Sequence, residues 1–369
     1  MPFDILTTVC RRVKRALHWG LPGALVSVAL LLQLPMAVQA QDENTEIGPQ
    51  HFNFLFENDL FGDSDAQYTN GLKLTWLSPD LKSLEGAPGL PRWLHSLVSR
   101  LNAFERAVVD DHGRQFNIGF GIGQMMYTPD DTQTRDLVVD DRPYAGWLYG
   151  ALTLVSKTDS VADMFEVQLG MIGSASLAEQ AQKFVHDVRD LPSPRGWSNQ
   201  LDNEPGLLLY YERRWRLLRS DLFRGFEYDA FVHAGLALGN VADYAALGAE
   251  FRVGWHLPRD FGTSLIRPGG DASAPSAISS TDVRDRRLGV YTFAAFGGRA
   301  VARDIFLDGN TFSDSHDVNK KHFVGDLVIG ASVVYGAAKL SYAQVFRSRE
   351  FDGQDRVHNY GSVSLSFSF

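Results

Sequence analysis

Apolar and polar residues alternate along most of this chain, in segments that recur from residue 51 to the end. The last segment shows the pattern most clearly, because its apolar residues alternate with serines: Val363, Leu365, Phe367 and Phe369. Successive side chains of a β-strand point to opposite faces, so each segment is predicted to be a strand with one apolar face. Twelve such segments occur, at 51–59, 69–78, 114–127, 145–157, 162–173, 206–218, 224–239, 245–257, 288–302, 321–335, 337–347 and 357–369.

The strand pattern predicts an all-β fold, a twelve-stranded antiparallel transmembrane β-barrel. An even number of amphipathic strands, each near the ~10 residues that a tilted strand needs to cross a bilayer, is typical of bacterial barrels. A soluble sandwich also has alternating strands. The barrel is favoured because aromatic residues gather near the predicted strand ends, where they would meet the two membrane interfaces, and because the last strand ends on an aromatic residue.

The first 40 residues have the composition of a secretory signal peptide. A basic region at 11–15 precedes an apolar run from Leu21 to Val38 and a small-residue ending at Ala40. We expect residues 1–40 to be removed and residues 41–369 to form one barrel domain. A retained membrane helix is the alternative, which the prolines within the run and the lack of a basic stop disfavour.

Composition narrows the possible functions. The only cysteine, Cys10, lies in the predicted signal, so the exported chain has no cysteine nucleophile, disulfide or cysteine metal site. The formal net charge is −9, and the signal is itself basic, so the exported chain is more acidic still. Nucleic acid is therefore not an expected partner.

Strand counting assigns the connections to the two sides of the membrane. With the exported N-terminus in the periplasm, the loops that face outward are 60–68, 128–144, 174–205, 240–244, 303–320 and 348–356. Two inner connections, 79–113 and 258–287, are longer than the periplasmic turns of most barrels. We expect an amphipathic helix in the first and a flexible segment in the second.

A short helix is predicted in the third outer loop. Ser176 and Glu179 have the spacing of a capping box, and the apolar residues that follow fall on one face at helical spacing. Gln182 and His186 are four residues apart on the polar face, so their side chains are neighbours. A single histidine on a loop helix is by default a solvated residue, and its role depends on what lies opposite.

Polar clusters from distant parts of the sequence are predicted to meet this helix. Strand parity places Glu57-Asn58-Asp59, Tyr68-Thr69-Asn70-Gly71 and the segment 140–146 at the same outer rim. A carboxylate, amides, a hydroxyl and an imidazole at one membrane surface are typical of a hydrolytic site.

Five motifs occur in order along the chain: Glu57-Asn58-Asp59, Tyr68-Thr69-Asn70-Gly71, Asp141-Arg142-Pro143-Tyr144-Ala145-Gly146-Trp147, Gln180-Ala181-Gln182-Lys183-Phe184-Val185-His186 and Gly196-Trp197-Ser198-Asn199-Gln200-Leu201. This ordered set, which extends over essentially the whole exported chain, resembles the outer-membrane lipid A 3'-O-deacylase family. The resemblance implies a twelve-stranded barrel with a calcium-dependent esterase site between the barrel wall and a helical outer loop. The reaction would remove the 3'-O-linked acyl or acyloxyacyl group from lipid A of lipopolysaccharide.

The resemblance also assigns catalytic roles. His186 matches the histidine that acts as general base toward water, a task that suits a neutral imidazole. Asn58, Thr69 and Gln182 match further catalytic positions.

The metal and the substrate are assigned in the same way. Asp59 and Glu57 are the expected carboxylate ligands of Ca²⁺, which needs six to eight oxygen ligands in all. Some relatives carry a lysine for lipid A phosphate in the loop after the third strand, and this chain has none there. Arg135 is its expected replacement, with Arg142 as a second substrate-binding residue, because a guanidinium binds phosphate bidentately.

Two other functions stay open. An outer-membrane phospholipase A would act on glycerophospholipid esters at the same surface, through a serine–histidine pair. No Gly-x-Ser-x-Gly motif is present, so attack by water is the favoured mechanism. A passive channel is the non-enzymatic alternative. In all three cases we expect a bacterial outer-membrane protein, and for the enzyme a monomer with its site facing the outer leaflet.

Overall fold

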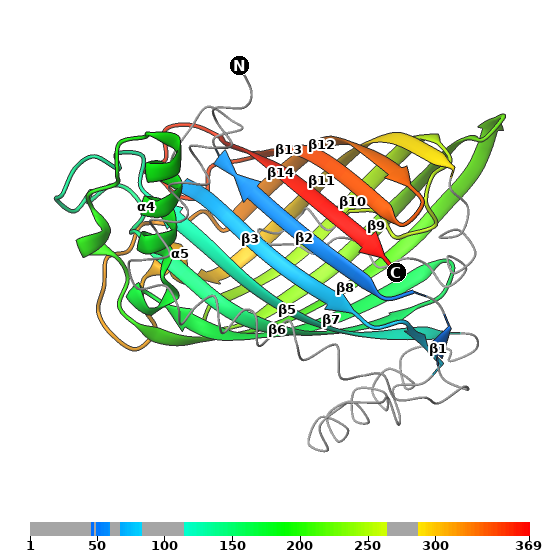
Figure 1. Ribbon diagram of the computed structural model, residues 1–369. Coiled ribbons are helices and arrows are strands. Elements are labelled where there is room, and N and C mark those ends of the chain that lie inside the picture. The colour runs from blue at the N-terminus through cyan, green and yellow to red at the C-terminus, as the bar shows by residue number, and fades with distance from the viewer. Residues whose placement is uncertain (1–45, 48, 60–66, 83–113, 264–286) are drawn as a thin grey trace.

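The structure is a computed structural model, and it describes residues 46–47, 49–59, 67–82, 114–263 and 287–369. Its main elements are twelve long strands, whose arrangement Figure 1 shows. They are β2 (His51–Asn58), β3 (Gln67–Leu77), β5 (Gln115–Thr128), β6 (Ala145–Lys157), β7 (Val161–Ile172), β8 (Glu204–Phe223), β9 (Phe226–Gly239), β10 (Ala242–Trp255), β11 (Leu288–Asp304), β12 (Phe323–Tyr335), β13 (Ala338–Arg347) and β14 (His358–Ser368). Each predicted strand is present, and β8 is longer at both ends than the sequence pattern indicated.

The strands close into an antiparallel barrel. Each long strand pairs with the next, and β14 pairs with β2, so that Phe367 lies opposite Phe52. Closure leaves none of these strands with an unpaired edge, which a membrane-spanning sheet requires. Two short strands, β1 (Glu46–Ile47) and β4 (Asp80–Leu81), pair with each other beside β5. The predicted fold class is confirmed.

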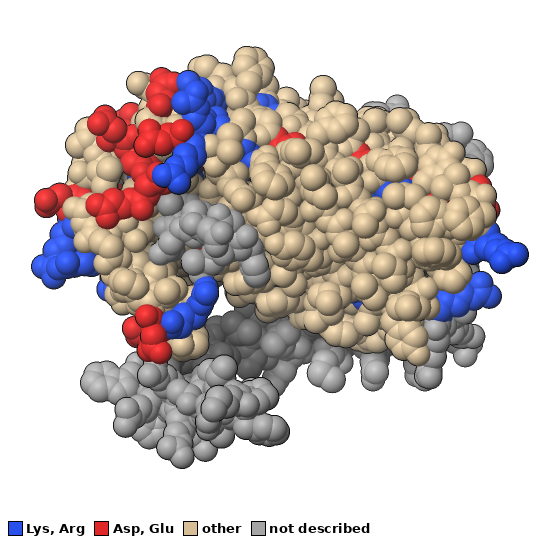
Figure 2. Space-filling model, turned by 90° about the horizontal axis from the view of Figure 1, so that it is seen from above, with Lys and Arg blue, Asp and Glu red and all other residues tan. Residues whose placement is uncertain are grey.

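The wall is apolar outside and polar inside. Large apolar side chains such as Leu247 and Phe296 are 69% and 65% exposed on the outer face. Charged side chains fill the lumen, where Lys73 Nζ lies 2.9 Å from Glu166 Oε2. Figure 2 shows charged residues gathered at the two ends of the barrel, with a nearly uncharged band between them. Within the described ranges, no helix has the length and hydropathy needed to cross a membrane.

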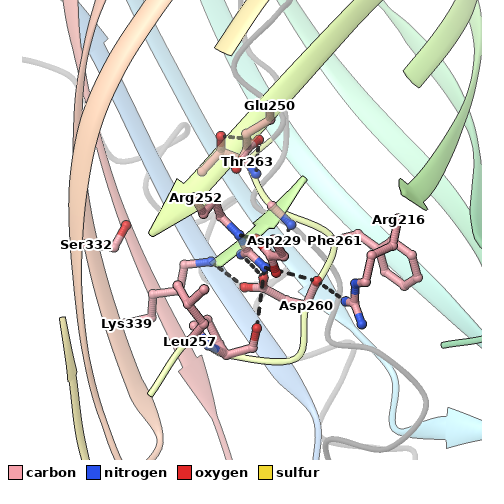
Figure 3. A network of polar contacts seen from close by, with 12 residues as sticks. Arg216, Asp229, Glu250, Arg252, Leu257, Asp260, Phe261, Thr263, Ser332 and Lys339 are labelled. Carbon is pink, nitrogen blue, oxygen red and sulfur yellow. Dashed lines mark hydrogen bonds and ion pairs between the residues drawn. The ribbon is translucent and has the colours of Figure 1, made fainter. Parts of the chain in front are cut away.

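The residues that follow β10 reach into one end of the lumen. Asp260 in this segment pairs with Arg252 of β10 and lies 2.6 Å from Lys339 Nζ of β13, as Figure 3 shows. Burial by itself would raise the pKa of Asp260, but Lys339 and Arg252 outweigh this effect and lower the pKa below its ordinary range. Arg252 also pairs with Asp229 at 2.6 Å. Asp260 is thus held by buried ion pairs, while the Gly-, Pro- and Ser-rich part of the segment expected to be flexible lies almost entirely outside the described residues.

The opposite end carries the helices and the longer loops (Figure 1). They are η3 (Ser174–Ser176), α4 (Ala178–Arg189), η4 (Trp197–Asn199) and α5 (Ile305–Asp308). Phe306 of α5 stacks on Tyr127 with ring centroids 4.1 Å apart, so α5 packs on the end of the lumen. The predicted signal peptide, most of the predicted helix within 79–113, and residues 264–286 of the second long connection lie outside the described residues.

Candidate active site on the outer wall

A β-bulge shapes the wall at the start of β3. Tyr68 pairs with Tyr127 and Asn70 pairs with Met126, so Thr69 has no counterpart on β5. A bulge of this kind places two consecutive side chains on one face of the sheet. Tyr68 points into the lumen, while Thr69 and Asn70 both face outward.

Polar groups meet on the outer face beside this bulge. Asn58, the last residue of β2, donates from Nδ2 to the carbonyl oxygen of Thr69 at 2.9 Å. The hydroxyls of Thr69 and Thr128 are hydrogen-bonded at 2.7 Å. Asp59 follows Asn58 directly and is completely buried. The end of β2 and the bulge of β3 therefore form one polar cluster, although the wall below them is apolar.

Helix α4 lies against the outer wall because a glycine permits close approach. A side chain at Gly146 of β6 would come within 2.3 Å of Ala178 Cβ and 2.1 Å of Ser176 Oγ. Gln124 of β5 donates from Nε2 to the Ser176 carbonyl at 2.6 Å. These contacts fix the beginning of α4 on β5 and β6.

The predicted capping box is wrong. The residue at the N-cap is Leu177, in a left-handed conformation and without a side-chain hydrogen bond to the helix. Ser176 instead donates to the Gly173 carbonyl at 2.6 Å, because it belongs to the preceding turn η3. The helix lies almost where it was predicted, but its first turn is held by the barrel wall.

The buried side of α4 is its polar side. Ala178, Gln182 and His186 are buried, with Gln182 and His186 each only 3% exposed, while Phe184 is 44% exposed. A surface helix normally buries its apolar stripe. The reversal means that an amide and an imidazole are enclosed between α4, the wall and the segment that follows the helix.

Gln182 is oriented by an aromatic pair. Trp197 of η4 donates from Nε1 to Gln182 Oε1 at 2.8 Å, and its ring packs on Tyr144 with centroids 4.9 Å apart. Since an indole can only donate, the acceptor atom of the amide must be Oε1. Gln182 Nε2 is buried and has no hydrogen-bond partner among the described residues. The amide thus offers two N–H groups to a ligand.

His186 has a defined tautomer. Its Nδ1 lies 2.7 Å from the carbonyl oxygen of Pro192. A carbonyl only accepts, so Nδ1 carries the proton and Nε2 is the basic nitrogen of the neutral ring. The chain folds back after α4 to supply this carbonyl.

The wall cluster and the helix cluster adjoin across β5. Met126 pairs with Asn70 in the sheet and packs with Ala178 and Trp197 on its outer side. Asn58, Thr69, Gln182 and His186 are therefore brought to one corner of the molecule, as expected.

Of three other predicted residues, two lie on the lumen side and one lies on an exposed loop beside η4. The Glu57 carboxylate accepts a hydrogen bond of 2.6 Å from the Tyr68 hydroxyl inside the lumen, because neighbours in a strand point to opposite faces. Arg142 is buried on the lumen side and pairs with Glu350 at 3.2 Å. Arg135 is exposed on the loop between β5 and β6, where its carbonyl accepts from Asn199 Nδ2 at 2.9 Å. The structure does not bring Glu57 or Arg142 to the outer-face cluster.

The sequence reasoning did not single out the residues that orient the cluster. Trp197 and Tyr144 stand in the quoted motifs, but nothing in their spacing indicated contact with Gln182. No pattern in the sequence indicated that Thr128 contacts the cluster. Within the described ranges, no group of three or more His, Cys, Asp or Glu side chains is arranged to hold a metal ion.

Comparison with known proteins identifies the family and the fold. The sequence model of the family described as "Outer membrane protein LpxR" matches residues 25–369. A search of curated protein sequences gave no match. Among solved structures, LpxR from Salmonella typhimurium superposes with a TM-score of 0.67 at 17% identity, over 86% of this chain and 100% of that one. At this identity the likeness shows the fold alone.

A second solved structure is more distant. The β-domain of the Bordetella autotransporter BrkA gives a TM-score of 0.42 at 9% identity, over 88% of this chain and 100% of that one. The family match covers almost the entire chain. The protein therefore belongs to the outer membrane protein LpxR family and is an outer-membrane protein with a closed β-barrel fold.

Proposed function

We propose that this protein is an outer-membrane esterase that removes the 3'-O-linked acyl or acyloxyacyl group from lipid A. Membership of the LpxR family and the five sequence motifs support the substrate and the bond. The observation that carries the proposal is the buried polar side of α4, where Gln182 and His186 face the outer wall.

The position of the cluster suits a lipid substrate. Asn58, Thr69 and α4 lie on the outer side of the barrel, so an ester of a lipid in the adjoining leaflet reaches them without leaving the membrane. The site would face the outer leaflet, where lipid A resides. The lumen plays no part in substrate access in this proposal.

The residues can hydrolyse an ester with water. His186 Nε2 accepts a proton from water while the water oxygen bonds to the acyl carbon. Negative charge that develops on the carbonyl oxygen is stabilised by the N–H groups of Gln182. The ester C–O bond then breaks, and the proton on His186 passes to the 3'-oxygen. The products are a carboxylic acid and lipid A with a free 3'-hydroxyl.

The oxygen donors at the bulge fit a calcium ion. Asp59 would hold it, together with backbone carbonyls and water, since Ca²⁺ prefers carboxylate and carbonyl oxygen. The Glu57 carboxylate is turned into the lumen and is not part of this donor set. Bound there, the ion would supply positive charge near the ester carbonyl. Asn58 and Thr69 hold the shape of this edge through their mutual hydrogen bond.

Arg135 is the proposed contact for a lipid A phosphate. It lies on an exposed loop that is hydrogen-bonded to η4, the turn that carries Trp197. Arg142, by contrast, already pairs with Glu350 in a buried position. We therefore assign Arg142 a structural role in this proposal.

The lumen does not favour a passive channel. Buried ion pairs bridge it near both ends, through Asp260 with Lys339 and through Arg142 with Glu350. Planar-bilayer recordings should accordingly show no stable single-channel current. A phospholipase A would act at the same outer surface on a different lipid, and in the known serine–histidine type by a different nucleophile.

Mass spectrometry of lipid A tests the proposal. Membranes containing the wild-type protein should lose the 3'-linked acyl group, while membranes containing His186→Ala should retain it. The matched control is His256→Ala, at the opposite end of the barrel, which should behave as wild type. Release of lysophospholipid with intact lipid A would establish the phospholipase instead.

A further inference from the structure

We propose that Asn70 is a substrate-binding residue, which hydrogen-bonds the carbonyl groups at the boundary between the sugar and the acyl chains of the lipid. This inference rests on the proposed function and deepens it. It arises from the bulge at Thr69, which turns Asn70 to the lipid-facing side of β3.

The register of three strands defines the direction of Asn70. It pairs with Asn58 on β2 and with Met126 on β5, and Met126 packs against α4 on the outer wall. The next residue, Gly71, faces the lumen, because a side chain there would meet the Tyr68 hydroxyl at 1.9 Å. Without the bulge, Asn70 would occupy the lumen side and Thr69 alone would face outward.

Asn70 is a polar residue at the edge of an apolar surface. The next outward-facing residue on the same strand is Leu72, which is 38% exposed, and the outward-facing residue before Asn58 on β2 is Phe56. Acyl chains can lie on Leu72 and Phe56, while their ester and amide carbonyls come level with Asn70. The boundary between polar and apolar atoms on the wall thus matches the one in a lipid.

The amide of Asn70 is available for binding. It is half-buried, and its side chain makes no hydrogen bond within the described part of the chain. An amide that is withdrawn from water without a partner is unfavourable, which a bound lipid would correct. Its two N–H groups suit ester and amide carbonyls, and its oxygen suits an amide N–H or a hydroxyl. Asn58 already donates to the Thr69 backbone carbonyl, and the Thr69 hydroxyl is paired with that of Thr128, so Asn70 is the residue of the bulge that remains for the substrate.

Steady-state kinetics on purified lipid A in mixed micelles tests the inference. Asn70→Leu should raise KM roughly 3- to 10-fold and change kcat less than about 2-fold, as expected for one neutral hydrogen bond made equally to substrate and transition state. Asn70→Gln, which keeps the amide, should recover part of the loss. A purely structural role would instead lower kcat or reduce the yield of folded barrel.

The matched control is Thr292→Leu, which makes a similar polar-to-apolar change on the outer face of β11. It should leave KM unchanged, and the heat-dependent gel mobility of both variants should equal that of wild type. If wild type releases the acyl group and Asn70→Leu has an unchanged KM, this inference is overturned and the proposed function stands. If wild type releases no acyl group from lipid A, both are overturned.

Discussion

The indole of Trp197 donates a hydrogen bond of 2.8 Å to Oε1 of Gln182, and this contact decides which end of the amide faces the candidate site. Trp197 lies in η4, after the chain has turned back from α4. The turn η4 thus orients the Gln182 amide through the indole N–H of Trp197.

Removing the indole donor should impair catalysis without unfolding the site. In Trp197→Phe the ring can still pack on Tyr144, but the Gln182 amide is free to flip, so kcat should fall on the order of 10-fold, less than for loss of an oxyanion donor outright. The measurement is acyl release from lipid A.

The control for this variant is Trp255→Phe. Trp255 is exposed on the outer wall at the last residue of β10, at the end of the barrel opposite the site. An equal loss of activity in both variants would contradict a specific role for the Trp197 donor.

The hydroxyl of Thr128 should support activity because it is hydrogen-bonded to the hydroxyl of Thr69. Thr128→Val removes the partner that lies 2.7 Å from the Thr69 hydroxyl, with little change of shape. We expect activity to fall roughly 3- to 10-fold, the value of about one buried hydrogen bond. Thr128→Ser keeps the hydroxyl and should stay within about 2-fold of wild type. Equal activities of the Val and Ser variants would show that this hydrogen bond does not support the site.

Glu350 should be a main determinant of barrel stability. It lies within 4 Å of three buried guanidinium groups, with separations of 3.2 Å to Arg142, 3.5 Å to Arg347 and 3.8 Å to Arg299. Glu350→Gln leaves those cations under-compensated, which should cost about 3–5 kcal/mol in the free energy of unfolding. Urea unfolding in detergent measures the difference. Asp352→Asn, a charge removal at an exposed position of the same loop, should cost less than about 0.5 kcal/mol.

Glu350 should also make the free energy of unfolding depend on pH. Burial raises the pKa of Glu350, but Arg347, Arg142 and Arg299 outweigh it and lower the pKa from 4.5 to about 2. A carboxyl group with a lowered folded-state pKa stabilises the fold above its unfolded pKa, and this stabilisation is lost as the pH falls through the folded value. The free energy of unfolding of wild type should therefore decrease between pH 4.5 and about 2. The decrease should be smaller in Glu350→Gln. Equal slopes of unfolding free energy against pH in the two proteins would contradict this role of Glu350.

Calcium removal should act through Asp59. If Asp59 holds the ion, a chelator should abolish acyl release by wild type, and added Ca²⁺ should restore it. Asp59→Ala should be inactive at low calcium. Asp80→Ala alters a buried carboxylate beside Lys157 in β4, which follows the end of β3 that is far from the site, and serves as the comparison. Full activity of wild type in excess chelator would exclude the calcium proposal.

The sequence alone was sufficient to predict the barrel fold. Alternation of apolar and polar residues is a local property, and lipid on one side with a polar lumen on the other imposes it on every strand. All twelve strands could therefore be located before the structure was known. Alternation also implies that Glu57 and Asn58 point to opposite faces, although the motif alone suggested that they act together.

The site depended on contacts that no local pattern encodes. The bulge at Thr69 exists because of how β3 aligns with β5, and the burial of the polar side of α4 depends on the close approach that Gly146 allows. The partners of Gln182 and His186 come from a turn that folds back after the helix. The sequence indicated the candidate site residues and the strands and helix on which they lie. Only the tertiary structure decided which face each one meets, because strand register and loop packing are set by the closed barrel as a whole.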